Sequence, residues 1–361
     1  MASAPNDQGQ LRLRIRVALN TFADEGIMDL DVERVALSVE EACLLGRAAL
    51  RGAGLPEDEA GIITDHLVEN MLSGYEFAGL PRVIAIVEHP NFPQPKSDVR
   101  VVHETAMSSM IDGGNHVGYA PVLKGALLCA EKAQKHGMAI VGVNNCWFSG
   151  RLAYYLERIA NNGLVAIHTA SGLANVVPPG ASKPLLGTNP IGFAIPTTGN
   201  PLIFDMGTAS TMWGEVLLYA MLNKHFPEGI GVDSGGRPTT SAREISKGGV
   251  LPFGGHKGYG LSVMVQALGV LSGAKRAAGN VIDSGFLFIA VDPALMMPRE
   301  EFYKQMDEMI TQLRELPRQP GVDRIRIPSD RTFAERLRRS KEGLHLPAEV
   351  YRRLLEMSGA V

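Results

Sequence analysis

The sequence predicts a protein of the α/β class, because stretches with helical patterning alternate with short apolar runs. Helix-start signals occur at Ser38 and at Leu55. Four apolar runs have the length and the flanking Gly or Pro residues of buried strands: 138–143, 164–168, 191–195 and 202–205. No GxGxxG motif follows a first strand, which argues against an ordinary Rossmann dinucleotide domain.

Length and composition narrow the class of function. With 361 residues the chain is long enough for two lobes, and 45% hydrophobic with 20% charged residues is typical of a soluble globular protein. A net charge of −3 offers no basic field for nucleic acid. No apolar run reaches membrane-spanning length, and no signal-peptide core is present. Three cysteines without metal-site spacing indicate reduced thiols, a cytoplasmic location and no metal centre.

The N-terminal third is predicted to hold an extension and two helices. Residues 1–36 form the extension, in which 11–17 alternate apolar and basic residues, as expected of a strand or a pairing arm, or equally of a loosely ordered tail. Ser38 and Glu41 have capping-box spacing for a helix to about Gly52. A second helix, acidic in its first turn, follows Leu55.

Further helices and turns are expected along the rest of the chain. A strand end and turn at 111–118 leads into a helix whose small residues suggest close packing. The expected helices cover 120–136, the region of Tyr154 and Tyr155, 213–222, 261–271, 300–316, 333–340 and 347–357.

The stretch 180–210 is predicted to form a buried hairpin that ends in small residues. Asp205, Met206, Gly207 and Thr208 would then offer backbone N–H groups to a close-lying ligand, because no bulky side chain blocks the approach. The alternative is a core hairpin with an ordinary loop.

The segment 254–260 opens a helix with glycines and a lysine. Helix N-termini attract anions, so His256 and Lys257 are candidates for holding a pyrophosphate. The spacing of a Walker loop is absent.

Three segments in this order, 180–210, 251–260 and 326–331, resemble the malate/L-lactate dehydrogenase-like oxidoreductases, nicotinamide enzymes without a Rossmann domain. The resemblance covers about residues 37 to 357 and is nearest to the piperideine-2-carboxylate/pyrroline-2-carboxylate reductases. It implies an NAD(P)-binding domain at 113–290 with a mainly antiparallel sheet, and a helical substrate lobe from 37–112 and 291–361. It also implies a homodimer.

The resemblance implies a residue that binds the substrate, but the histidine that acts as the acid in the family is absent from this sequence. The family's Ser-His-Gly-x-x-Arg loop corresponds to residues 77–82, so Gly79 and Arg82 are retained and Ala78 replaces the histidine. Arg82 would hold the substrate carboxylate with its planar fork. The alternative is a surface or interdomain ion pair.

A second histidine of the family is also replaced, by Phe148. Trp147 and Phe148 would form an aromatic wall, or simply pack in the core, and the pocket would include Thr188 and Asn189. Three residues are candidates for the missing acid: Tyr75, Glu76 and His116, although a turn histidine is more often structural.

The remaining family segments point to the cofactor. Ser171 and Gly172 lie in a loop that touches it in relatives, and Ser329, Asp330 and Arg331 correspond to the segment at its adenosine end. Asp330 suits ribose hydroxyls and Arg331 a 2′-phosphate, so both NADH and NADPH remain open.

Together these residues predict an NAD(P)H-dependent oxidoreductase acting on a small carboxylate. A cyclic or N-alkyl imino acid is the preferred substrate, because its nitrogen is protonated before hydride arrives. The alternatives are a 2-hydroxyacid/2-oxoacid dehydrogenase with a relocated acid, and a catalytically impaired member with a regulatory role.

Overall fold

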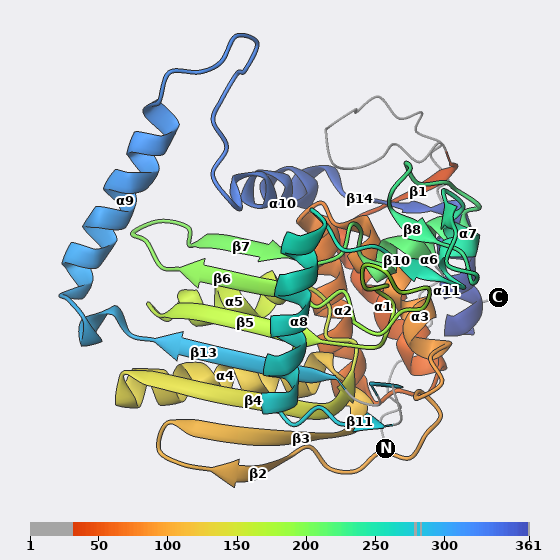
Figure 1. The fold of residues 1–361 in the computed structure, drawn as a ribbon, viewed down its shortest axis with the longest axis horizontal. Coiled ribbons are helices and arrows are strands. Elements are labelled where there is room, and N and C mark those ends of the chain that lie inside the picture. Colours follow the sequence, from red (N-terminus) through yellow and green to blue (C-terminus); the bar gives the residue numbers. More distant parts are fainter. Residues whose placement is uncertain (1–31, 278–279, 282–283, 360–361) are drawn as a thin grey trace, which may run out of the picture.

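A seven-stranded sheet lies at the centre of the computed structural model, which describes residues 32–277, 280–281 and 284–359 (Figure 1). The segment 11–17 is outside these residues. All neighbouring strands are antiparallel except β3 and β4, so the predicted mainly antiparallel, non-Rossmann sheet is confirmed. The strands in spatial order are β2 (Arg100–Glu104), β3 (Ser108–Val117), β4 (Met138–Trp147), β13 (Gly285–Val291), β5 (Val165–Ser171), β6 (Ile191–Ile195) and β7 (Leu202–Met206).

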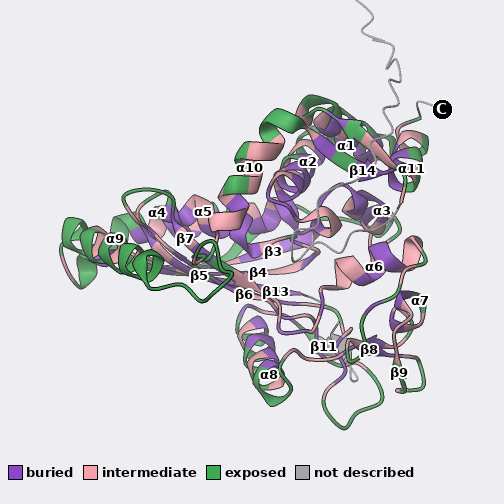
Figure 2. Ribbon diagram, turned by 90° about the horizontal axis from the view of Figure 1, so that it is seen from above, coloured by how far each residue is buried: buried purple, intermediate pink, exposed green. Residues whose placement is uncertain are grey.

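Helices cover both faces of this sheet (Figure 2). On one face lie α4 (Tyr119–His136) and α5 (Leu152–Ala160), and on the other lies α8 (His256–Leu271). A Cβ at Gly125 would stand 2.5 Å from Val143, so the glycine lets α4 approach the sheet closely. One hydrophobic core fills the space between the sheet, α4 and α5.

The N- and C-terminal segments combine into a helical lobe, as predicted. It contains α1 (Val39–Gly52), α2 (Glu57–Leu72), α3 (Pro81–Val87), α10 (Asp330–Glu342) and α11 (Ala348–Ser358). The strands β1 (Arg34–Leu37) and β14 (Leu344–Pro347) pair beside them. The capping box at α1 is confirmed, with Ser38 accepting from the Glu41 N–H and Glu41 accepting from the Ser38 N–H at 2.7 Å.

The connection between β7 and β13 carries small elements that complete the fold. These are α6 (Trp213–Met221), β8 (Gly231–Val232), β9 (Pro238–Thr239), α7 (Ala242–Ile245) and β10 (Gly249–Val250), followed after α8 by β11 (Arg276–Ala277) and β12 (Asn280–Val281). Buried side chains of this connection, such as Tyr219 and Val250, pack into the core of the helical lobe. The boundaries at 113 and 290 therefore stay a prediction, and the sheet itself begins at Arg100.

Three further elements complete the described chain: η1 (Glu76–Ala78), η2 (Pro293–Leu295) and α9 (Arg299–Glu315). The helix α9 lies beyond the ends of the strands (Figure 1), and none of its residues is fully buried. Within the described residues, no helix has the length and apolar character needed to cross a membrane.

Candidate active site

A cavity of about 720 Å³ lies where η1, α3, α6 and the C-terminal ends of β4 and β5 meet. Half of the residues expected at the site line it: Tyr75, Arg82, Trp147, Phe148, Ser171, Gly172, Thr188, Asn189, Asp205 and Gly207. The others lie outside its lining: Glu76, Gly79, His116, Met206, Thr208, His256, Lys257, Ser329, Asp330 and Arg331.

Arg82 is one of three arginines that line this cavity, together with Arg151 and Arg353. It lies in the first turn of α3, directly after Pro81, and not in a loop as the sequence suggested, because proline at a first helical position favours helix. The Arg82 Cζ stands 4.2 Å from the centre of the Phe148 ring. Among the described residues no carboxylate pairs with Arg82, so the alternative of an interdomain ion pair has no support there. A stacked guanidinium without a counter-charge attracts a bound anion.

Aromatic rings form one wall beside Arg82. Trp147 is 3% exposed, and its Nε1 donates to the Asn115 carbonyl, so it belongs to the core as well as to the wall. Phe148 has a φ of 55°, an uncommon conformation for a bulky residue, which turns its ring toward Arg82. His89 stacks on Trp147 at 4.2 Å, and sequence reasoning missed it. No sequence signal pointed to it, because His89 lies beyond the end of α3 and meets Arg82 only at the ring of Phe148.

Tyr75 is the acid candidate that lines the cavity. Its ring lies between two guanidinium groups, 4.1 Å from the Arg151 Cζ and 5.4 Å from the Arg331 Cζ. Burial alone would raise the pKa of the phenol, but Arg151 and hydrogen bonds from Arg331 and Thr332 lower it overall. A phenol with a lowered pKa is a better proton donor to an alkoxide.

The other two acid candidates are held in ion pairs away from the cavity. Arg34 contacts both carboxylate oxygens of Glu76 at 3.0 Å. Burial raises the pKa of Glu76, and the Arg34 charge opposes that rise. His116 contacts Glu59 through Nδ1 and the Ser97 carbonyl through Nε2. Their geometry gives no support to a catalytic role.

Asp205 lines the cavity and contacts the first turn of α5. Its carboxylate accepts the Ala153 N–H at 2.9 Å at the start of α5, where the helix dipole favours a negative charge. Burial raises the pKa of Asp205, and Arg151 works against that rise. The expectation that the following loop keeps its N–H groups available is wrong for Thr208, whose N–H donates to the Thr188 carbonyl at 2.8 Å.

His66 is a second residue that sequence reasoning missed. It lies buried on α2, and its Nε2 accepts the N–H of Arg151 at 3.1 Å. Burial and then Arg151 lower the pKa of His66 well below its ordinary value, so the ring is neutral. A Cβ at Gly150 would stand 2.4 Å from that Nε2, so this close approach requires glycine. His66 therefore positions Arg151, and its place on a mainly apolar helix gave no signal of this.

The start of α8 has the features of a phosphate site, although it does not line the cavity. Gly254 and Gly255 have positive φ and open space where a Cβ would lie. The 16-residue helix has no side-chain cap at its N-terminus, and Lys257 is exposed there. The Phe253 N–H donates to the Thr208 carbonyl and so ties this turn to the loop that follows β7. The N–H groups of Lys257 and Gly258 donate to the Gly254 and Phe253 carbonyls of the same turn. An exposed lysine at an uncapped helix N-terminus nevertheless suits a pyrophosphate.

Two side-chain oxygens of residues that line the cavity are buried and need a hydrogen-bond donor. Asn189 is fully buried, and its Nδ2 donates to the Ser262 carbonyl at 2.9 Å and to Gln266 at 3.1 Å, both on α8. The Oδ1 atoms of Asn189 and Asn175 are buried without a hydrogen-bond partner in the described chain. Both residues line the cavity. Buried acceptors of this kind fit a ligand that donates N–H groups, such as the carboxamide of a nicotinamide.

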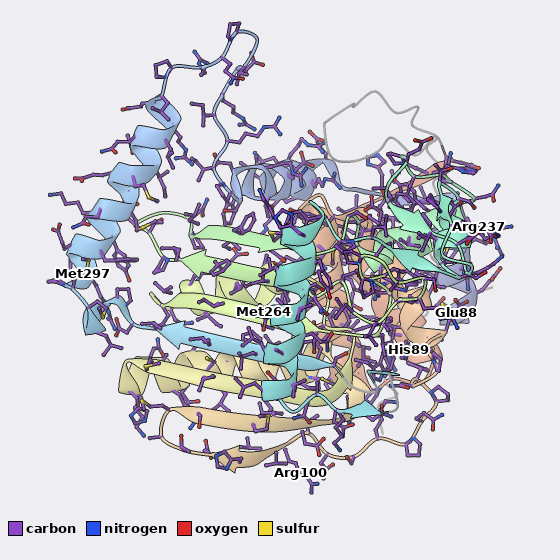
Figure 3. The ribbon with its side chains drawn as sticks, viewed as in Figure 1. Glu88, His89, Arg100, Arg237, Met264 and Met297 are labelled. Carbon is purple, nitrogen blue, oxygen red and sulfur yellow. The ribbon has the colours of Figure 1, made fainter. Side chains whose placement is uncertain are left out.

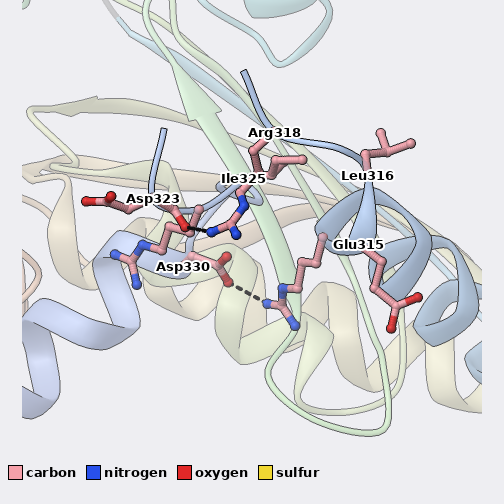
Figure 4. A pocket seen from close by; sticks show the side chains of 8 residues that line it. Glu315, Leu316, Arg318, Asp323, Ile325 and Asp330 are labelled. Atoms are coloured by element: carbon pink, nitrogen blue, oxygen red, sulfur yellow. Dashed lines mark hydrogen bonds and ion pairs between the residues drawn. The ribbon is translucent and has the colours of Figure 1, made fainter. Parts of the chain in front are cut away.

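The C-terminal segment 329–331 is placed differently from the sequence expectation. Asp330 accepts from Arg314 at 2.7 Å and from the Ile327 N–H at 3.1 Å, in a separate hollow between α9 and α10 (Figure 4). Ser329 accepts the Ile203 N–H of β7. Only Arg331 reaches toward the cavity, through Tyr75. Contacts of Ser329 and Asp330 with a ribose therefore stay a prediction.

Comparison with known proteins agrees with this geometry. A family model described as malate/L-lactate dehydrogenase matches residues 37–355. The malate/(S)-sulfolactate dehydrogenase of Methanothermus fervidus is 34% identical over 333 residues, which cover 89% of this chain and 97% of that protein. The Δ1-pyrroline-2-carboxylate/Δ1-piperideine-2-carboxylate reductase of Pseudomonas syringae pv. tomato is 34% identical over 69% of this chain and 74% of its own.

Solved structures give the same result. A dehydrogenase from Sinorhizobium meliloti superimposes with a TM-score of 0.81 and 27% identity, covering 90% of this chain and 98% of its own. The match over nearly the whole length, in sequence and in fold, confirms the resemblance inferred from the three segments. The chain belongs to the malate/L-lactate dehydrogenase family.

Proposed function

We propose that this oxidoreductase reduces a small cyclic or N-alkyl imino acid with NAD(P)H, in the cavity around Arg82. The observation that carries the proposal is Arg82 itself, a guanidinium stacked on Phe148 without a carboxylate partner among the described residues. A bound carboxylate supplies the missing counter-charge and meets a fork that holds both of its oxygens. The relatives' names support this substrate class, since they include dehydrogenases and reductases of small carboxylates.

The residues present fit a nicotinamide dinucleotide, which when bound supplies the hydride. The turn from Gly254 to Lys257 would hold the pyrophosphate, and the unpartnered acceptors of Asn175 and Asn189 would take the carboxamide N–H groups. Arg331 is available for a 2′-phosphate but also contacts Tyr75, so NADH and NADPH both enter the test.

The proton supply favours an imine over a ketone. At the two positions where the resemblance puts histidines, this chain has Ala78 and Phe148, and neither side chain donates a proton. A ketone needs a proton as the hydride arrives, whereas an imine nitrogen carries its proton beforehand. The name of the Pseudomonas relative, a pyrroline- and piperideine-carboxylate reductase, agrees with this preference.

A second candidate is reduction of a 2-oxo acid with Tyr75 as the acid. One observation favours it: Tyr75 lines the cavity, and its flanking arginines lower the pKa of the phenol. The malate dehydrogenases among the relatives agree with it as well. A purely regulatory role has less support, because a protein without activity has no need for an arginine that lines a cavity without a carboxylate partner among the described residues.

The test measures binding first and then turnover. NADH and NADPH fluorescence titrations give both dissociation constants, and steady-state rates compare Δ1-piperideine-2-carboxylate with a matching 2-oxo acid at equal pH. We expect higher kcat/KM for the imine, and little change of it in Tyr75→Phe. Strong ketone reduction that Tyr75→Phe abolishes would overturn the imine proposal in favour of the second candidate. Absence of cofactor binding would contradict both.

We further propose a homodimer in which a second copy covers α9. This 17-residue helix buries no residue in its own chain, yet it exposes Met309 and Leu313. Isolated helices of this length are marginal in water without a packing surface. Light scattering should give twice the chain mass for the native protein and a smaller value for Leu313→Lys. Glu308→Lys on the same helix is the matched control, and a native monomer would contradict the proposal.

We also propose a cytoplasmic location. Cys43, Cys129 and Cys146 are all thiols, as expected in a reducing compartment. Fractionation of cells that produce the full chain tests this, and recovery outside the cytoplasm would contradict it.

A further inference from the structure

We infer that His89 is a second substrate-binding residue, which donates its Nε2–H to the same carboxylate that Arg82 holds. The inference rests on the proposed function, because it assumes that a carboxylate occupies the cavity. It concerns a residue outside the segments that carry the family resemblance.

His89 and Arg82 are brought together by α3. Arg82 is in the first turn of this helix, and His89 follows its C-cap, Glu88 (Figure 3). His89 lies just beyond the end of the helix, in a turn in which its N–H donates to the Ile86 carbonyl at 3.2 Å. They meet at one ring: the Arg82 Cζ is 4.2 Å and the His89 ring centre 4.9 Å from the centre of Phe148. Both residues line the cavity.

The His89 ring is fixed on three sides. One face stacks on Trp147, with an interplanar angle of 12°. An edge meets Phe148. The Nδ1 atom accepts the Asn91 N–H at 3.2 Å. Within the described residues the remaining polar atom, Nε2, has no protein partner and is not closed off from solvent.

These contacts decide the protonation state. Because Nδ1 accepts a backbone N–H, the ring hydrogen of the neutral form is on Nε2. Burial and the nearby Arg82 charge lower the pKa of His89, which agrees with a neutral ring. Nε2–H is then a fixed donor beside Arg82.

A neutral donor in this place suits a carboxylate better than it suits proton transfer. A ring that gives up its Nε2 proton must take one at Nδ1, and the Asn91 N–H occupies that side. A carboxylate has lone pairs for both the guanidinium fork and one additional donor. His89 therefore contributes to substrate affinity and not to the chemical step.

The experiment separates binding from turnover. Picolinate, a planar carboxylate that the enzyme cannot reduce as an imino acid, is titrated calorimetrically into the full chain with the oxidised cofactor present. His89→Phe keeps the stacking on Trp147 but loses the donor, so the picolinate Kd should rise roughly tenfold or more. His89→Gln restores an N–H donor and should recover most of the affinity. His136→Phe, the same exchange at the exposed end of α4, is the control.

Kinetics provide the second readout. On the imino acid, His89→Phe should raise KM and leave kcat and cofactor affinity unchanged. A picolinate Kd equal to that of the native protein, or a loss confined to kcat, would overturn the role of His89. If Arg82→Lys alone weakens picolinate binding, the proposed function stands and this inference fails. If neither variant does, both fail.

Discussion

Replacing Arg82 by lysine tests whether this residue binds the substrate carboxylate in the cavity. The substitution keeps the positive charge but removes the planar fork and its stacking on Phe148, 4.2 Å away. A hydrogen bond to a charged group contributes about 1.5–3 kcal/mol, which corresponds to roughly a tenfold to a hundredfold weaker substrate interaction. Loss of the cation–π contact adds about 0.5–1 kcal/mol.

The assay is steady-state kinetics with the carboxylate varied, together with cofactor titration by fluorescence. Arg82→Lys should raise KM by that factor and leave the cofactor Kd level, because Arg82 lines the cavity and the α8 turn proposed for the pyrophosphate does not. Arg353→Lys is the matched control, since Arg353 lines the same cavity but is already paired with Glu88.

Two results would refute the reasoning. One is a cofactor Kd that rises as much as KM, which would place Arg82 in the cofactor site. The other is equal turnover of the amide of the substrate by the native protein, which would show that no carboxylate is recognised.

Two further predictions concern the cofactor and stability. Lys257→Ala should weaken NADH or NADPH binding by about one to two decades, through loss of a charge-assisted contact to phosphate; unchanged affinity for both in a folded variant would remove Lys257 from the site. His168 is fully buried, and burial lowers its pKa from 6.5 to about 3. Below pH 6.5 the unfolded chain takes up a proton that the folded chain does not bind, so the free energy of unfolding decreases as the pH falls, by about 1.6 kcal/mol between pH 6.5 and pH 5. His168→Asn, which retains a donor for the Leu287 carbonyl, should flatten this part of the urea-unfolding profile, and parallel profiles would contradict the assignment.

The sequence predicted the elements well where local chemistry decides them. The Ser38 capping box, the apolar runs of β6 and β7 and the small residues of α4 specify structure within a few neighbours. Family segments added the antiparallel sheet, which local patterns do not specify.

The site was only partly predictable because its geometry depends on contacts distant in sequence. Asp205 lies in β7, yet its carboxylate accepts a hydrogen bond at the start of α5, and Glu76 is paired with Arg34 from β1. His89 becomes informative only when Phe148 places it beside Arg82. Spacing along the chain does not contain these tertiary pairings.

The most direct measurement is a crystal structure of the full chain with oxidised nicotinamide cofactor and picolinate. We predict the picolinate carboxylate on Arg82, the ring against Phe148 and the nicotinamide in the same cavity. A carboxylate bound elsewhere, or a nicotinamide outside this cavity, would contradict the account.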